Sequence, residues 1–125
     1  MLPVMQSRTG ANGNCMEASL ASLLELPLDA VPDLGTNAQW LPRLADFLAG
    51  RGLYYILVAP LDPEEQHILT PMFARGDVYH IIEGISPRGG PHACVGCNGE
   101  LVHDPHPGGH GLAKVDGFGF IGVRL

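Results

Sequence analysis

The chain has 125 residues, of which 46% are hydrophobic, and its 13 acidic and 7 basic side chains give a net charge of −6. This length and composition fit one globular domain, so we expect residues 1–125 to form a single unit with its own core. The acidic balance and the scattered Lys and Arg residues disfavour binding to nucleic acid or to an anionic membrane.

The N-terminal part of the chain predicts an extended arm followed by two helices. Loop-forming residues dominate positions 1–14, and an apolar run predicts a core helix from Cys15 to about Leu24. Thr36 or Asn37 is expected to cap a second helix, because apolar residues recur at helical spacing from there to about residue 50.

The rest of the chain predicts mainly strands. Residues 60–76 are poorly patterned, although residues 62–65 could open one helical turn. Helices first and antiparallel strands afterwards indicate an α+β fold in which the N-terminal helices pack on the sheet. The expected strands are Leu53 to Ala59, Val78 to Ile85, His92 to Cys97, Glu100 to His103 and Gly117 to Leu125.

Cys15 stands at the predicted start of the first helix, directly after Gly13 and Asn14. A thiol in this position meets unpaired backbone N–H groups and the positive end of the helix dipole, which should lower its pKa. His92 lies far downstream, and Asp104 follows it by 12 residues. Cysteine, histidine and a carboxylate in that order are the components of a thiol hydrolase.

The turn at Asn98-Gly99 allows two alignments of the strands on either side of it. A two-residue loop pairs Cys97 with Glu100 and sends Asp104 to the face opposite His92. A three-residue loop pairs Gly96 with Glu100 and sets His92 against Asp104, with Cβ atoms about 4.5–5.5 Å apart. The sequence does not distinguish the two loops, but the proposed chemistry requires the three-residue form.

The chain resembles the papain-like cysteine peptidase superfamily, and within it the small C39-like proteins of bacteria and phages. The resemblance rests on Gly13-Asn14-Cys15 before an Ala/Ser/Leu helix, on His92 opening a strand, and on Asp104-Pro105. It implies a compact papain-like fold and hydrolysis of a peptide, isopeptide or other amide through a thioacyl intermediate. It assigns Cys15 as the nucleophile, His92 as the base and Asp104 as the residue that orients the base.

The resemblance also implies an oxyanion donor, for which Gln6 is the candidate and Asn12 and Asn14 are substitutes. Asn14 and Arg88 are the candidates for binding substrate, with Arg88 placed to meet a substrate carboxylate. The expected partner is a peptide or protein substrate, and no cofactor or metal is expected.

Two other functions remain open. The same scaffold could serve as a binding protein without catalysis. Alternatively, Cys94 and Cys97 could bind zinc together with His103, His106 and His110, although strand alternation would put the two cysteines on opposite faces. The odd number of cysteines and the lack of a signal-peptide pattern favour a reduced, cytoplasmic setting.

Overall fold

The computed structural model describes residues 1–59 and 62–125, which form an α+β fold. The α-helices are α1 (Cys15–Leu24), α2 (Trp40–Ala49) and α3 (Thr70–Phe73), and the short 3-10 helices are η1 (Gly10–Asn12), η2 (Leu28–Ala30) and η3 (Glu65–Leu69). The strands are β1 (Leu53–Val58), β2 (Tyr79–Ile85), β3 (Pro91–Cys97), β4 (Glu100–His103) and β5 (Lys114–Val123). None of the helices in the described ranges has the length and apolar character that a bilayer span requires.

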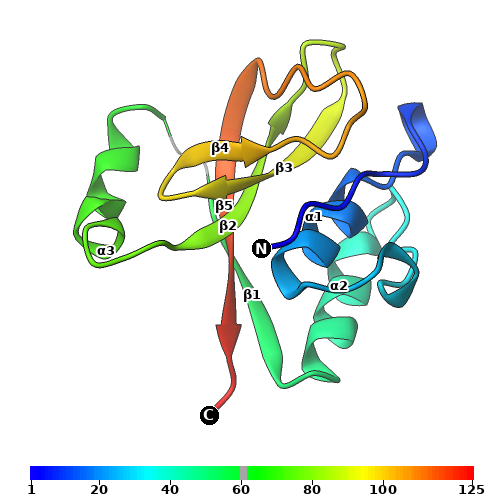
Figure 1. Cartoon of the computed structure of the whole chain (residues 1–125), viewed down its shortest axis with the longest axis horizontal. Helices are drawn as coiled ribbons and strands as arrows, with labels where there is room; N and C mark the ends of the chain where they lie inside the picture. The colour runs from blue at the N-terminus through cyan, green and yellow to red at the C-terminus, as the bar shows by residue number, and fades with distance from the viewer. Residues whose placement is uncertain (60–61) are drawn as a thin grey trace.

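All five strands join one antiparallel sheet in the order β1-β5-β2-β3-β4. The last strand of the chain therefore lies between the first and the second. Figure 1 shows α1 and α2 together on one side of the sheet, whereas α3 lies on the other. This arrangement confirms the expectation of N-terminal helices packed on an antiparallel sheet.

The main core lies between the two long helices and the sheet. Leu20 of α1 and Leu44 and Leu48 of α2 are fully buried there, and Leu53, Tyr55 and other residues of β1 and β5 cover them from the sheet side. Leu44 and Leu48 are four residues apart and so share one face of α2, as the helical spacing predicted. Burial of α1 against α2 and β3 fixes the position of its first residue, Cys15.

The boundaries of two segments differ from the sequence prediction. Residue Asn37 does not cap α2, because its side-chain Oδ1 accepts the N–H of Gln39 in a local turn, and the helix begins only at Trp40. The poorly patterned segment contains η3 and α3, so it is more helical than the single turn expected from residues 62–65. Pro60, where that segment was taken to begin, lies outside the described residues.

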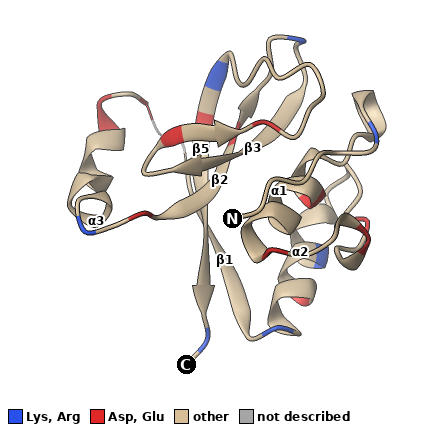
Figure 2. Cartoon of the chain, in the orientation of Figure 1, with Lys and Arg blue, Asp and Glu red and all other residues tan. Residues whose placement is uncertain are grey.

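Charged residues are spread thinly over the fold. Figure 2 shows Lys and Arg singly on different elements, with no gathering of blue on any one of them. This distribution agrees with the scattering of Lys and Arg along the sequence.

The β3–β4 hairpin has the two-residue loop, so the expected three-residue loop is wrong. Cys97 pairs with Glu100, and Asn98 and Gly99 both have positive φ, 52° and 85°, as this tight turn requires. The ladder then shifts: Gly96 pairs with Leu101, but Val95 pairs with His103. Val102 is thus an extra residue in a β-bulge, and it moves every later residue of the second strand by one position.

This bulge reverses the consequence of the shorter loop. Without it, the two-residue loop would place Asp104 on the face opposite His92. The one-residue shift returns Asp104 to the face that carries His92 and Cys94, because side chains alternate along a strand.

His80 of β2 contacts the turn of this hairpin through a side-chain hydrogen bond. Its Nδ1–H donates to the carbonyl of Ile81 at 3.0 Å, and its Nε2 accepts the N–H of Gly99 at 3.0 Å, so the ring is neutral. The ring is fully buried against Phe73, Phe118 and Phe120. Burial lowers the pKa of His80, and the hydrogen bond to Ile81 opposes this only in part.

We therefore expect the protein to lose stability as the pH falls below about 6.5, the ordinary pKa of histidine in an unfolded chain. Because the folded pKa of His80 is lower, the unfolded state takes up the proton first, and stability is complete only above that pH. Urea unfolding at about pH 7.5 and about pH 5.5 measures the difference.

In His80→Gln this pH dependence should shrink, whereas the exposed control His110→Gln should behave as the wild type does. An unchanged pH dependence in His80→Gln would show that other groups control acid stability.

Candidate active site

Cys15 is the first residue of α1 and lies in the wall of a groove of about 1000 Å³. The sequence predicted both ends of this helix correctly. The groove runs along the junction of the N-terminal arm, α1 and the sheet. Residues that line it include Gln6, Cys15, Trp40, Arg88, His92 and His106. The structure thus brings the predicted nucleophile and the predicted base to one surface.

His92 is held by a direct contact with Asp104. The ring Nε2 donates to the Oδ1 of Asp104 at 2.7 Å, and both side chains are only 5% exposed. Because the carboxylate engages Nε2, the neutral ring carries its proton there and leaves Nδ1 as the basic nitrogen. Within residues 1–59 and 62–125, Nδ1 makes no hydrogen bond. The pairing of His92 with Asp104 was predicted, although the loop from which it was argued was not.

The carboxylate of Asp104 has further partners. Its Oδ1 also accepts the N–H of His106 at 2.9 Å, and its Oδ2 accepts the N–H of Gly111 at 2.7 Å. Burial alone would raise the pKa of Asp104, but the hydrogen bonds from these backbone groups and from His92 outweigh it and lower the pKa below the ordinary value. The group is therefore a carboxylate at neutral pH and fixes the loop of residues 104–111 around itself.

The Cys15 thiol is less acidic than the sequence suggested. Burial raises its pKa; a hydrogen bond from the backbone N–H of Ala93 opposes this, and the negative charge of Glu17 adds to the rise. Backbone N–H groups at the helix start also favour the thiolate, as expected, but they do not compensate for burial. The expectation of a lowered pKa is therefore wrong, and at neutral pH Cys15 is a protonated thiol.

Gln6 lines the groove but is partly committed elsewhere. One amide proton of its Nε2 is donated to the carbonyl of Arg8 at 2.7 Å, and its backbone N–H is donated to Pro105 at 3.0 Å. Its Oε1 is buried without a hydrogen-bond partner in the described part of the chain. The second Nε2 proton is the one that could reach an oxyanion.

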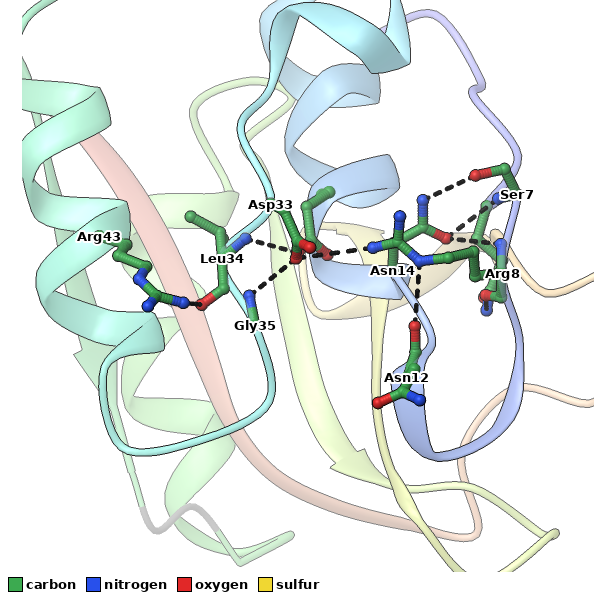
Figure 3. Close-up of polar contacts among 10 residues, drawn as sticks. Ser7, Arg8, Asn12, Asn14, Asp33, Leu34, Gly35 and Arg43 are labelled. Atoms are coloured by element: carbon green, nitrogen blue, oxygen red, sulfur yellow. Dashed lines mark hydrogen bonds and ion pairs between the residues drawn. The ribbon is translucent and has the colours of Figure 1, made fainter.

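Asn14 differs from the expectation that it binds substrate. Its Oδ1 accepts the N–H groups of Ser7 and Arg8 at 3.0 and 2.9 Å, and its Nδ2 donates to the hydroxyl of Ser7. Both polar atoms of the side chain are thus occupied, and the residue is only 4% exposed. Figure 3 shows Asn14 directed at this part of the arm, so its role is to hold the arm against α1.

The neighbours of Asn14 extend this network. Arg8 donates from Nε to the carbonyl of Asn12 at 3.1 Å and lies 3.5 Å from the carboxylate of Asp33 (Figure 3). Since Asn12 contributes its backbone carbonyl, its side chain is not part of this network. The arm is therefore fixed to α1 and to the segment that follows η2.

Arg88 lies on the exposed β2–β3 turn and lines the groove. Hydrogen bonds between Ser86 and both Gly89 and Gly90 close this turn at 2.9 Å each. Binding of substrate by Arg88 stays a prediction.

The sequence analysis missed two side chains at the site. Glu17 is buried in the groove wall, where its Oε1 accepts the N–H of Leu34 at 3.0 Å. Cys94 is fully buried, with its sulfur within 4.8 Å of a carboxylate oxygen of Asp104, and burial together with the negative charge of Asp104 raises its pKa. A signal for Cys94 was present, because it follows His92 by two residues in a predicted strand and so shares its face.

The ligands of the alternative zinc site, considered from the Cys94-Val95-Gly96-Cys97 spacing, do not come together in the described residues. His103 donates from Nε2 to the carbonyl of Val4, and the Nδ1 of His106 accepts the N–H of Gly108. In the described residues, Cys94 instead forms a cluster with His92 and Asp104.

Comparisons of the chain with protein-family models, with curated proteins and with solved structures found no match. The functional argument therefore depends on the geometry of the site.

We expect Asn14→Ala to destabilise the protein by about 2 kcal/mol, because it leaves the N–H groups of Ser7 and Arg8 without their acceptor. Asn14→Asp keeps both acceptor positions and should be closer to the wild type. Urea unfolding measures both changes.

The matched control is Asn12→Ala, which leaves the carbonyl of Asn12 in place for Arg8. Equal losses in Asn12→Ala and Asn14→Ala would show that the side chain of Asn14 does not hold the arm.

Proposed function

We propose that the protein is a cysteine-dependent hydrolase of amide bonds, a peptidase, isopeptidase or amidase, built on a papain-like scaffold of the small C39-like kind. Cys15 is the nucleophile, His92 the general base and Asp104 the residue that orients the base. The observation that carries the proposal is the histidine ring held through Nε2 by a buried carboxylate, in the same groove as a thiol at a helix start. This leaves Nδ1 as the atom that receives the thiol proton.

The reaction begins when a substrate carbonyl enters the groove beside Cys15. Nδ1 of His92 removes the thiol proton while sulfur attacks the carbonyl carbon, and the carbonyl oxygen becomes an oxyanion. The N–H of Cys15 and the free amide proton of Gln6 stabilise this oxyanion. His92 then gives its proton to the leaving amine as the C–N bond breaks, and the acyl group remains on sulfur.

Water completes the cycle. His92 takes a proton from water, the hydroxide attacks the thioester, and the thiolate leaves and recovers its proton from the ring. Asp104 stabilises the imidazolium that forms in each half of the cycle.

The raised pKa of Cys15 selects one form of this mechanism. A protonated thiol in the resting enzyme means that deprotonation accompanies attack and does not precede it. Such a thiol reacts slowly with simple alkylating agents and faster with acyl donors that fill the groove and exclude water. This behaviour suits a hydrolase with a defined substrate.

The groove supports a peptide or protein as the substrate. Its volume of about 1000 Å³ accommodates several residues of an extended chain. Arg88 at the rim would bind a carboxylate of that chain. Three cysteines without disulfide partners fit a reducing compartment such as the cytoplasm.

We expect a panel of p-nitrophenyl acyl esters to acylate Cys15, giving one acyl group per chain by intact mass and peptide mapping. Cys15→Ala should abolish the adduct. His92→Ala should slow its formation by roughly 10²–10⁴-fold, the usual contribution of a general base. Cys97→Ala is the matched control, since Cys97 is the other partly exposed cysteine and lies outside the groove lining.

Acylation of Cys97 in preference to Cys15 would refute the nucleophile. Saturable peptide binding in the groove that persists in Cys15→Ala, with no acylation of the wild type, would instead favour a binding protein.

We expect Asp104→Asn to reduce turnover by roughly tenfold to a hundredfold, less than His92→Ala does, because asparagine keeps an acceptor for His92 but removes the charge that stabilises imidazolium. Steady-state ester hydrolysis measures turnover, and a single-turnover experiment measures acylation alone. A thermal melt must show that the variant is folded. Wild-type turnover in folded Asp104→Asn would exclude an orienting role for the carboxylate.

A further inference from the structure

A second chemical feature shares the deepest wall of the site. Donor atoms of His92, Cys94 and Asp104 all lie within 4.8 Å of one another. The first two residues are neighbours on one face of β3, and the bulge at Val102 brings the third to the same face. These atoms are a nitrogen, a sulfur and an oxygen, and they come from two adjacent strands.

Cys94 has no part in the proposed acyl transfer. It is fully buried, and its sulfur lies within 4.8 Å of a carboxylate oxygen of Asp104. A buried cysteine usually serves as a small apolar side chain among other apolar groups. Here it shares its pocket with a charged group and an imidazole, an arrangement that a packing role does not require.

We infer that His92, Cys94 and Asp104 form a binding site for a divalent cation of the zinc class. Nitrogen, thiolate and carboxylate are the three donor types that zinc takes from proteins, and three protein ligands leave the fourth tetrahedral position open. Asp104 already carries the negative charge, and the thiolate of Cys94 supplies a second one when the metal binds.

The donors need only a small rearrangement. Zinc–ligand bonds of roughly 2.0–2.3 Å place tetrahedral donors about 3.3–3.8 Å apart. The Nε2 of His92 and the Oδ1 of Asp104 are now 2.7 Å apart, so this nitrogen–oxygen pair must separate by about 0.6–0.8 Å. The His92 ring that must move lines the groove. The backbone N–H groups of His106 and Gly111 hold the carboxylate in place meanwhile.

Binding changes the location of two protons. The thiol proton of Cys94 leaves to solvent as the sulfur–metal bond forms. The proton on Nε2 of the neutral His92 ring moves to Nδ1, because Nε2 now binds the metal. Metal binding therefore places a proton on the nitrogen that was to accept one from Cys15. If the proposed function is right, the metal-bound protein cannot start acyl transfer, and the cation is an inhibitor.

Cobalt(II) is the probe for the binding site, because thiolate-bound cobalt gives a charge-transfer band in the near ultraviolet and tetrahedral cobalt absorbs in the visible. Titration of the full chain should produce both features with one cobalt per chain. Cys94→Ala should lose the charge-transfer band, and Cys97→Ala should retain it. His92→Gln, which removes a second donor, should bind cobalt far more weakly and serves as the decisive variant if Cys94→Ala does not fold.

Cys15→Ala separates this inference from the proposed function. It cannot carry out acyl transfer, yet it should give the wild-type cobalt spectrum, because Cys15 is not one of the donors. Zinc should also raise the melting temperature of this variant but not that of His92→Gln. Loss of the charge-transfer band in Cys15→Ala, or its survival in Cys94→Ala, would overturn the site. Absence of any thiolate band in the wild type would overturn it as well.

A final experiment tests whether metal binding inhibits acyl transfer. Zinc should slow acylation of Cys15 in the wild type, and removal of zinc with a chelator should restore the rate. Cobalt binding at the three donors without any effect on acylation would keep the site and reject its link to the proposed function.

Discussion

The buried carboxylate of Asp104 is the group on which the site depends. A negative charge at this depth is stable only if hydrogen-bond donors surround it. The protein supplies two backbone N–H groups from the loop that follows β4 and one imidazole from β3. Satisfying this one charge therefore fixes a loop and orients a ring at the same time. Charge-assisted hydrogen bonds contribute about 1.5–3 kcal/mol each, so the carboxylate also stabilises the edge of the sheet.

The second constraint is the count of residues between the two strands. A two-residue loop alone would point Asp104 away from His92, and the extra Val102 restores the pairing. The outcome is a diagonal contact between strands, not the direct opposition that a three-residue loop would give. The presence of a histidine at position 92 and an aspartate at position 104 is therefore not sufficient to form the site. The number of residues between them decides which face of the sheet each side chain occupies.

Much of the fold could be predicted from local patterns. The bounds of α1 and β4 were predicted correctly, because an apolar run preceded by Asn14 and a strand between turn residues have clear limits. The start of α2 could not be, since Asn37 had a competing partner in its own turn. The helices of residues 65–73 depend on packing of Phe73 against the far side of the sheet, and no periodic pattern in the sequence predicts that contact.

The candidate site could be predicted from the order of its residue types along the chain. The pKa of Cys15 could not be predicted from the sequence, because it is raised by burial, and burial depends on how the whole groove is assembled. The hydrogen bonds of the Asn14 side chain likewise could not be predicted, because their partners Ser7 and Arg8 reach it only when the arm folds back against α1.

The place of β5 in the sheet has a consequence for how the molecule assembles. Among the described strands, β1 pairs with β5, which follows the other four strands in the chain. Until residues 114–123 emerge, neither β1 nor β2 has β5 as its hydrogen-bonded neighbour, so the sheet between them is not closed. Strands that pair over such a long sequence separation fold slowly, because the entropy of closing a long loop is lost before the stabilising contacts between the strands can form. On a ribosome, the chain would therefore carry Cys15, His92 and Asp104 for some time before the sheet that holds them together is complete.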